Sequence, residues 1–356
     1  MLSCNQKQKP GGMRKSLQNG TIAILAIVLC SLMQLASASQ GDENPEFQRC
    51  LRKCRKHDCS GPEGAEELLT EFPLSTLRWT CGEDCRYKCM LSVEKHRAEA
   101  GEEPIQYYGK WPFHRTGGCQ ELFSTGFSAA NALPHFYFLF VTRRSLPSSA
   151  MATALTLYAI ACINTWVWST AFHCRDNFWT ERLDYHCATV LIVASLFVTA
   201  VRILRIKSAK VMAGMGAVLA LLFGAHIWHM NFVLFDYGWN MQLSMGCALI
   251  NTFSWLAWVS VHWSKRPYVR HMALFNVLIV CAAMFEMFDF PPVLGLIDAH
   301  SVWHGLTVPL GFYYYHFWWM DILGESKHAG KDSMYAPAAG SSSDSQQAGL
   351  KLESAA

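Results

Sequence analysis

Residues 150–172 read AMATALTLYAIACINTWVWSTAF and contain no charged side chain. A transmembrane helix needs about 20 mostly apolar residues, so this stretch is long enough to cross a bilayer. Six further stretches resemble it, and those near residues 184 and 271 are the least apolar because charges lie at or near their ends. The pattern predicts an all-α membrane protein with seven transmembrane helices. The seven predicted spans cover residues 120–141, 150–172, 184–203, 211–230, 242–262, 271–290 and 299–320.

The distribution of charge separates this apolar region from the segment before it. Residues 122–320 contain 18 Asp, Glu, Lys and Arg side chains, whereas the much shorter segment 40–119 contains 26. A uniform soluble enzyme would not segregate its charge in this way, and a disordered chain would lack the 13 Trp, 12 Tyr and 21 Phe. The formal net charge of +3 is too small and too scattered to favour nucleic acid as a partner. The composition predicts a charged ectodomain in front of a membrane-embedded domain.

The first 38 residues have the features of a secretory signal peptide. A basic start precedes the apolar residues 21–35, and residues 36–38 read Ala-Ser-Ala, a small-residue cleavage pattern. The alternative is a retained signal anchor, because residues 16–41 contain no charge and could nearly span a bilayer. We expect cleavage after Ala38, which would place the next segment in the oxidising lumen of the secretory pathway.

Seven cysteines indicate that residues 39–119 form a small luminal domain stapled by disulfides. The repeated Cys-x3-Cys steps place both cysteines on one face of a helix, which predicts two short helices clipped together. A zinc cluster is the alternative, although thiolates in a secretory lumen are usually oxidised first. Six of the cysteines allow 15 pairings, among which the sequence does not choose, and Cys119 is a candidate partner for Cys174. The seven are Cys50, Cys54, Cys59, Cys81, Cys85, Cys89 and Cys119.

The short loops between the predicted helices set their orientation. The loops after the first, third and fifth spans contain eight Lys and Arg side chains, and the loops after the second, fourth and sixth contain two. Positive loops face the cytosol, so the N-terminal region is predicted to be luminal, in agreement with the signal peptide. Residues 120–323 would then form the transmembrane domain. Residues 324–356, rich in Ser, Ala and Gly, would form a disordered cytosolic tail.

Five side chains gather at the predicted luminal ends of three spans. Ser169 and His173 lie one helical turn apart, and so do His300 and His304, while Asp184 begins the third span. Two imidazoles one turn apart can hold one metal ion. A third imidazole from another helix would leave one position open for water, which is the arrangement of a catalytic rather than a structural zinc.

Packing is the more common role of a histidine near a helix end, and among 14 histidines some pairs at helical spacing arise by chance. We interpret His226 and His229 as interface residues, with a metal role as the lesser alternative. Glu121, Glu286 and Asp289 are either acids that support a metal site or the lining of a hydrated pocket. The remaining histidines in the spans are interpreted as structural: His135, His186, His262, His271 and His316.

The motifs Ser169-x3-His173, Asp184-Tyr185 and His300-Ser301-x-Trp303-His304 resemble a membrane hydrolase superfamily that includes alkaline ceramidases and the adiponectin/progestin receptors. Residues 111–115, WPFHR, and residues 180–185, TERLDY, are similar to one branch of it. That branch is the post-GPI-attachment lipid-remodelling factors, described as GPI-specific phospholipase A2-like proteins. The Cys-rich luminal domain behind a signal peptide points to the same branch. The resemblance extends over nearly the whole mature chain.

The resemblance implies that His173, His300 and His304 bind Zn²⁺, with Asp184 and Ser169 as catalytic partners of the water that the ion activates. It also implies the substrate, a GPI-anchored protein whose inositol phospholipid loses its unsaturated sn-2 acyl chain, and residence in the Golgi membrane or, alternatively, the endoplasmic reticulum. Asp184 would be the general base, and Ser169 would orient the water or donate to the oxyanion. Ser169 as an acyl-accepting nucleophile is disfavoured, because no Gly-x-Ser-x-Gly motif surrounds it.

The sequence is also compatible with three other functions. The same site in a related hydrolase could cleave the amide of a ceramide. A seven-span receptor could retain the metal as a structural element. A transporter or chaperone for GPI-anchored proteins would instead work through the Cys-rich domain.

Overall fold

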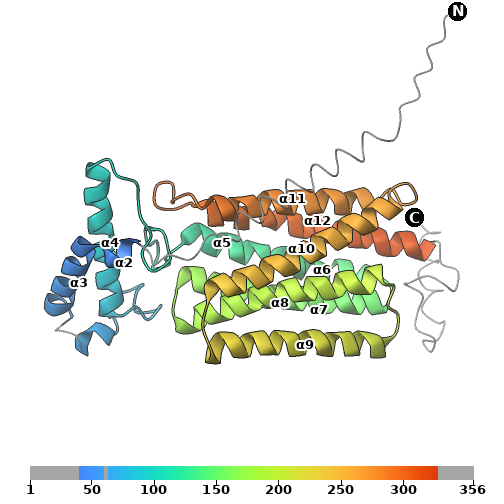
Figure 1. Cartoon of the computed structure of the whole chain (residues 1–356), viewed down its shortest axis with the longest axis horizontal. Coiled ribbons are helices and arrows are strands. Elements are labelled where there is room, and N and C mark those ends of the chain that lie inside the picture. Colours follow the sequence, from blue (N-terminus) through green and yellow to red (C-terminus); the bar gives the residue numbers. More distant parts are fainter. Residues whose placement is uncertain (1–39, 60–62, 328–356) are drawn as a thin grey trace, which may run out of the picture. The chain divides into compact units, whose positions relative to one another are not determined.

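The computed structural model describes residues 40–59 and 63–327, which form helices and no β-strand (Figure 1). The predicted signal peptide, residues 1–38, lies outside the described residues. The predicted cytosolic tail also lies outside them, apart from its first four residues. These four belong to a helix rather than to a disordered segment, because the last helix, α12, continues to Lys327.

Helices α3 (Pro45–His57) and α4 (Cys81–Glu99) form the Cys-rich domain, together with two shorter elements, α2 (Gln40–Glu43) and the 3₁₀ helix η1 (Glu63–Glu66). Asn44 caps α3, and Thr80 begins α4 with a capping box to Glu83. The predicted pair of disulfide-linked helices is confirmed. Three disulfides join the pair: Cys50–Cys89, Cys54–Cys85 and Cys59–Cys81.

Within the described residues, five helices are long and apolar enough to cross a membrane. They match the second to sixth predicted spans, and each begins two to six residues earlier than predicted except the first, which begins where expected at Ala150. The difference is largest for the helix after His173. Asn177 caps that helix and accepts hydrogen bonds from the backbone of Trp179 and Thr180, so the charged turn before Asp184 is already helical. The five are α7 (Ala150–Cys174), α8 (Phe178–Ile203), α9 (Ala209–Phe232), α10 (Tyr237–His262) and α11 (Val269–Phe288).

The first and seventh predicted spans differ from these five. Residues 120–141 form two helices, α5 (Leu122–Asn131) and α6 (Leu133–Phe140), interrupted at Ala132. Pro134 lacks a backbone N–H and cannot continue the hydrogen-bond ladder of α5, which explains the break. The 3₁₀ helix η2 (Thr142–Ser145) follows α6. Helix α12 (Ala299–Lys327) is long enough to cross a membrane, but its imidazoles, Pro309 and tyrosines make it less apolar than the other five. The part of the chain that the structure describes is therefore all-helical, with five clear candidate spans of a multi-pass membrane protein, and seven crossings stay a prediction.

The apolar helices pack side by side, with α7 against α8 and α12 against α11 and α5 (Figure 1). Gly311 lets α12 approach α6 closely, because a Cβ atom there would lie 2.6 Å from the ring of Pro134. Large side chains such as Phe138, Trp255 and Trp318 fill the core between these helices. The ends of α5, α7, α8, α11 and α12 that meet at one end of the bundle are thereby held in fixed positions.

The Cys-rich domain is attached to that same end of the bundle. The Cys119–Cys174 disulfide, for which the sequence suggested the partners, links the segment before α5 to the last residue of α7. The Arg175 guanidinium forms two hydrogen bonds with the Glu83 carboxylate of α4. The Trp111 indole donates to Asp289, just after α11, over 2.7 Å. These contacts cover the helix ends with polar and aromatic side chains.

Candidate metal centre

Three imidazoles converge where α7 ends and α12 begins. His173 lies in the last turn of α7, while His300 and His304 lie in the first two turns of α12. The Nε2 atom of His300 is 3.3 Å from that of His173 and 2.9 Å from that of His304. Helical periodicity stacks His300 above His304, and the packing of α7 close to α12 supplies the third ring. The structure thus brings together the three histidines that the sequence singled out.

Carboxylates fix two of these rings from behind. Glu121, the residue before α5, accepts a hydrogen bond from His173 Nδ1 over 2.6 Å, and Glu286 of α11 accepts one from His300 Nδ1 over 2.5 Å. A carboxylate only accepts, so Nδ1 carries a proton in both rings, and in the neutral form of each ring Nε2 would present a lone pair to the common centre. Such carboxylate–histidine pairs orient metal ligands in proteins. From the sequence alone, Glu121 and Glu286 were either acids that support a metal site or the lining of a hydrated pocket.

The third imidazole is positioned by packing instead. His304 is 2% exposed and packs against the rings of Trp166 and Trp303, whose centroids are 5.5 and 4.6 Å away. Its Nδ1 atom has no hydrogen-bond partner in the described part of the chain. The backbone carbonyl of His304 accepts a hydrogen bond from Asn131 at the end of α5. The ring is therefore held by its neighbours rather than by an acid.

The start of α12 is fixed by a local cap. Asp298 accepts a hydrogen bond from the backbone N–H of Ser301, and the Ser301 hydroxyl accepts one from the backbone N–H of Asp298. Both side chains are buried. The reciprocal pair has the geometry of a capping box and sets the rotation of the first turn, where His300 lies.

Asp184 and Ser169 lie beside the three imidazoles. The Asp184 carboxyl, in the second turn of α8, interacts with the Ser169 hydroxyl and with the His173 and His300 rings. The Ser169 hydroxyl also lies 3.1 Å from the hydroxyl of Ser128 in α5. Ser128 is fully buried. No local pattern marks Ser128, because a serine in an apolar stretch is ordinary and only the tertiary structure brings α5 against α7.

The donor set fits a zinc ion. With all three Nε2 atoms unprotonated, their lone pairs would converge and repel one another unless a cation lay between them. Ligands at about 2.0–2.1 Å in tetrahedral positions are separated by roughly 3.3 Å, close to the 3.3 and 2.9 Å between these nitrogen atoms. Three histidine ligands that leave one position open are typical of catalytic rather than structural zinc sites.

The other acid and the other histidines considered from the sequence lie outside the cluster. Asp289 accepts hydrogen bonds from Trp111 and Gln106, so it joins the Cys-rich domain to α11 and does not touch the cluster. His226 pairs with Asn240. Neither His226 nor His229 belongs to a possible metal-binding group among the described residues. His135 and His271 each hydrogen-bond a tyrosine of α12, as expected of structural residues.

A lysine outside the helices completes the polar network. Lys110 lies 2.7 Å from Glu121 and 3.2 Å from Asp176, and its ammonium group sits over the ring of Phe172. Burial alone would lower the pKa of Lys110, but the two carboxylates outweigh it and raise the pKa above its usual value. Lys110 therefore stays charged, and it keeps Glu121 ionised behind His173.

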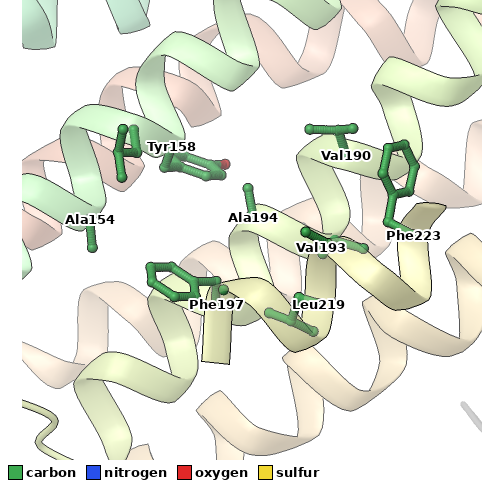
Figure 2. A pocket seen from close by; sticks show the side chains of 11 residues that line it. Ala154, Tyr158, Val190, Val193, Ala194, Phe197, Leu219 and Phe223 are labelled. Atoms are coloured by element: carbon green, nitrogen blue, oxygen red, sulfur yellow. The ribbon is translucent and has the colours of Figure 1, made fainter. Parts of the chain in front are cut away.

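An apolar cavity of about 300 Å³ lies further along the bundle, between α7, α8 and α9 (Figure 2). Tyr158, Phe197, Leu219 and Phe223 are among the side chains that point into it. The Tyr158 hydroxyl is its one polar side-chain group, so the cavity suits hydrocarbon and offers no chemistry of its own.

Comparison with known proteins identifies the family. The model of the Per1-like family matches residues 72–322, which include every residue of the cluster. The chain belongs to the Per1-like family. Per1-like relatives share its length as well as its sequence. "GPI-specific phospholipase A2-like PGAP3" of Danio rerio is 36% identical over 307 residues, which cover 85% of this chain and 96% of that protein.

Two further Per1-like relatives come from distant organisms. The PGAP3 protein of Homo sapiens is 33% identical over 83% of this chain and 93% of its own length. "Protein PER1 homolog" of Schizosaccharomyces pombe is 36% identical over 85% of this chain and 92% of its own length. The resemblance to post-GPI-attachment lipid-remodelling factors is confirmed, whereas the wider superfamily stays a prediction.

Proposed function

We propose that this protein hydrolyses the sn-2 ester of the inositol phospholipid of GPI-anchored proteins and so removes the unsaturated acyl chain. The names of its relatives support GPI-anchor remodelling by a phospholipase A2-like reaction. The observation that carries the hydrolytic step is the convergence of His173, His300 and His304, with Glu121 and Glu286 holding two of the rings.

The three histidines would hold Zn²⁺ through their Nε2 atoms. When bound at such a site, zinc lowers the pKa of a coordinated water to about 7 and polarises a carbonyl oxygen. The Glu121 and Glu286 carboxylates keep the Nδ1 atoms of their imidazoles protonated and thereby keep the ligand atoms available. A misplaced ring would cost both metal affinity and reaction rate.

Asp184 and Ser169 supply the proton chemistry in this proposal. The Asp184 carboxylate is close to His173 and His300, where it would accept the proton of the attacking water. The Ser169 hydroxyl, fixed between Asp184 and the Ser128 hydroxyl, would donate a hydrogen bond to the oxygen that gains charge. Ser169 acts through its proton and not as a nucleophile, since the site already provides for the activation of water.

The proposed reaction takes place on the luminal side of the membrane. The ends of the helices that carry the cluster, and the disulfide-linked domain attached to them, would face the lumen of the Golgi or endoplasmic reticulum. The four disulfides support an oxidising compartment. An acyl ester lies near the depth at which helix ends meet lipid head groups, so a site at the helix ends would meet its substrate there.

The test is the deacylation of a GPI lipid by purified protein. His304→Ala should abolish the release of the sn-2 fatty acid while the protein remains folded in the membrane. His316→Ala is the matched control, since it removes an exposed imidazole from the same helix far from the cluster and should leave release unchanged. Release at the wild-type rate by His304→Ala would refute the proposal. Release of fatty acid from ceramide, but not from the GPI lipid, would favour an amidase.

A further inference from the structure

A second cavity, of about 370 Å³, opens beside the histidine cluster. Side chains of the Cys-rich domain, of the segment 107–121 and of the turn between α7 and α8 line it. Unlike the apolar cavity between α7, α8 and α9, it is lined mainly by aromatic rings, together with cations and carboxylates in equal number. Neither the three histidines nor Asp184 lines it.

One carboxylate joins this cavity to the cluster. Glu121 lines the cavity, and its two oxygen atoms bind Lys110 Nζ over 2.7 Å and His173 Nδ1 over 2.6 Å. Lys110 lines the cavity too. A molecule in the cavity would therefore lie next to the back of a ring whose front faces the reaction centre.

The cations of the cavity differ in how far they are neutralised. Arg115 pairs with Asp84 and Arg175 with Glu83, and both guanidinium groups lie 3.8 Å from the centre of the Trp79 ring. These two are structural, because each guanidinium is already paired with a carboxylate of the protein.

Arg86 is the exception. Its side chain is exposed and lies over the ring of Tyr108, 5.3 Å from the centroid. No carboxylate lies within salt-bridge distance of it in the described part of the chain. An arginine at the rim of a cavity with open hydrogen-bond donors is suited to a phosphate group, which it can bind in a bidentate manner.

We propose that this cavity binds the phosphoinositol-glycan head group of the lipid substrate and selects it over simpler phospholipids. The inference rests on the proposed function for the identity of the lipid. In a glycerophospholipid the phosphorus atom is separated from the sn-2 carbonyl carbon by a few bonds, a span of roughly 6 Å. An ester at the histidine cluster therefore places its phosphate, and the sugars beyond it, on the side of Lys110 and Glu121.

The mixed lining favours a phosphorylated amino sugar over a bare anion. Arg86 would meet a phosphate, while Asp176 and Glu181, which already pair with Lys110 and Arg182, would share their carboxylates with an amine such as that of the glucosamine linked to inositol. The rings of Tyr108, Trp111 and Phe178 offer flat apolar faces to the C–H side of a sugar. A site for free phosphate would not need the aromatic rings, and the nearby carboxylates would weaken its affinity by repelling the anion.

The test measures binding without turnover. Full-length protein in detergent micelles is titrated with three water-soluble probes: the glycan head group left after complete deacylation of a GPI lipid, glycerophosphoinositol, and inorganic phosphate. The glycan should bind most tightly. Arg86→Gln should weaken its binding tenfold or more, because a hydrogen bond between charged groups is lost, whereas Arg86→Lys should weaken it less. Arg52→Gln, an exposed arginine outside the cavity, should bind like the wild type.

The outcomes separate this inference from the proposed reaction. Equal affinity of Arg86→Gln and wild type for the glycan would overturn it, and so would equal affinity of the wild type for glycan and inorganic phosphate. His304→Ala should bind the glycan normally. Tight glycan binding together with a wild-type protein that releases no fatty acid would refute the proposed reaction and leave the head-group site standing.

Discussion

Glu286 reaches His300 from a helix that contributes nothing else to the cluster, and this contact gives the sharpest prediction for a single residue. Glu286→Gln keeps the size of the side chain but removes the charge that holds the imidazole proton. Replacing such a partner typically costs about 10–100-fold in metal affinity or activity. Zinc affinity by competition with a chelator, and deacylation rate, should both fall by that factor. Glu99→Gln, on an exposed part of α4, should change neither.

Ser169 gives the second prediction at this scale. If its hydroxyl only donates a hydrogen bond, Ser169→Ala should slow deacylation by about 10²–10³-fold and leave residual activity. Ser128→Ala, which removes the neighbouring hydroxyl 3.1 Å away, should have a smaller effect in the same direction. Mass spectrometry of wild-type protein quenched during turnover should show no acyl group on Ser169, and an acylated Ser169 would establish the nucleophile role instead.

The five site residues could be chosen from sequence because helical spacing and topology place them at one end of the helices. Their supporting residues could not be assigned in the same way. Glu121 and Glu286 each had two interpretations, since whether a carboxylate meets an imidazole depends on how two helices pack. Ser128 was missed altogether, because nothing local marks a buried serine that meets a residue 41 positions later.

The first turn of α12 is the element on which the site depends most. Asp298 and Ser301 cap it, and two of the three imidazoles follow directly. Asp298→Ala should cost about 0.5–2 kcal/mol of stability. It should also weaken zinc binding, because His300 would lose its fixed orientation. Thermal unfolding with and without added zinc measures both effects. Zinc binding as tight as in the wild type, despite a lower unfolding temperature, would show that the cap does not position the ligand.

The apolar helices were predictable because a long uncharged stretch is compatible with few structures other than a transmembrane helix. Their ends were not, since polar caps such as Asn177 extend α8 through residues that hydropathy assigns to a loop. The break in the first predicted span follows from Pro134 and could have been expected. The disulfide pairing of the Cys-rich domain needed the tertiary structure.

At the scale of the whole molecule, the number of crossings decides which side of the membrane each part faces. Seven crossings place the Cys-rich domain and the end of α12 on opposite sides. In sealed vesicles with the cytosolic face outward, protease should remove a tag attached after residue 356 and should spare the disulfide-linked domain. Digestion of both, or protection of both, would require an even number of crossings and would contradict the predicted orientation.

The proposed function depends on one metal ion that joins α7 to α12 through three imidazoles. The most direct measurement is the metal content of purified wild-type protein and of His173→Ala, determined by elemental analysis after dialysis against metal-free buffer. A single three-histidine site predicts about one zinc per wild-type chain and a much smaller content in His173→Ala, with the unfolding temperature of both recorded as a control. Equal zinc in the two proteins, or no zinc in a wild-type protein that still releases the fatty acid, would contradict it.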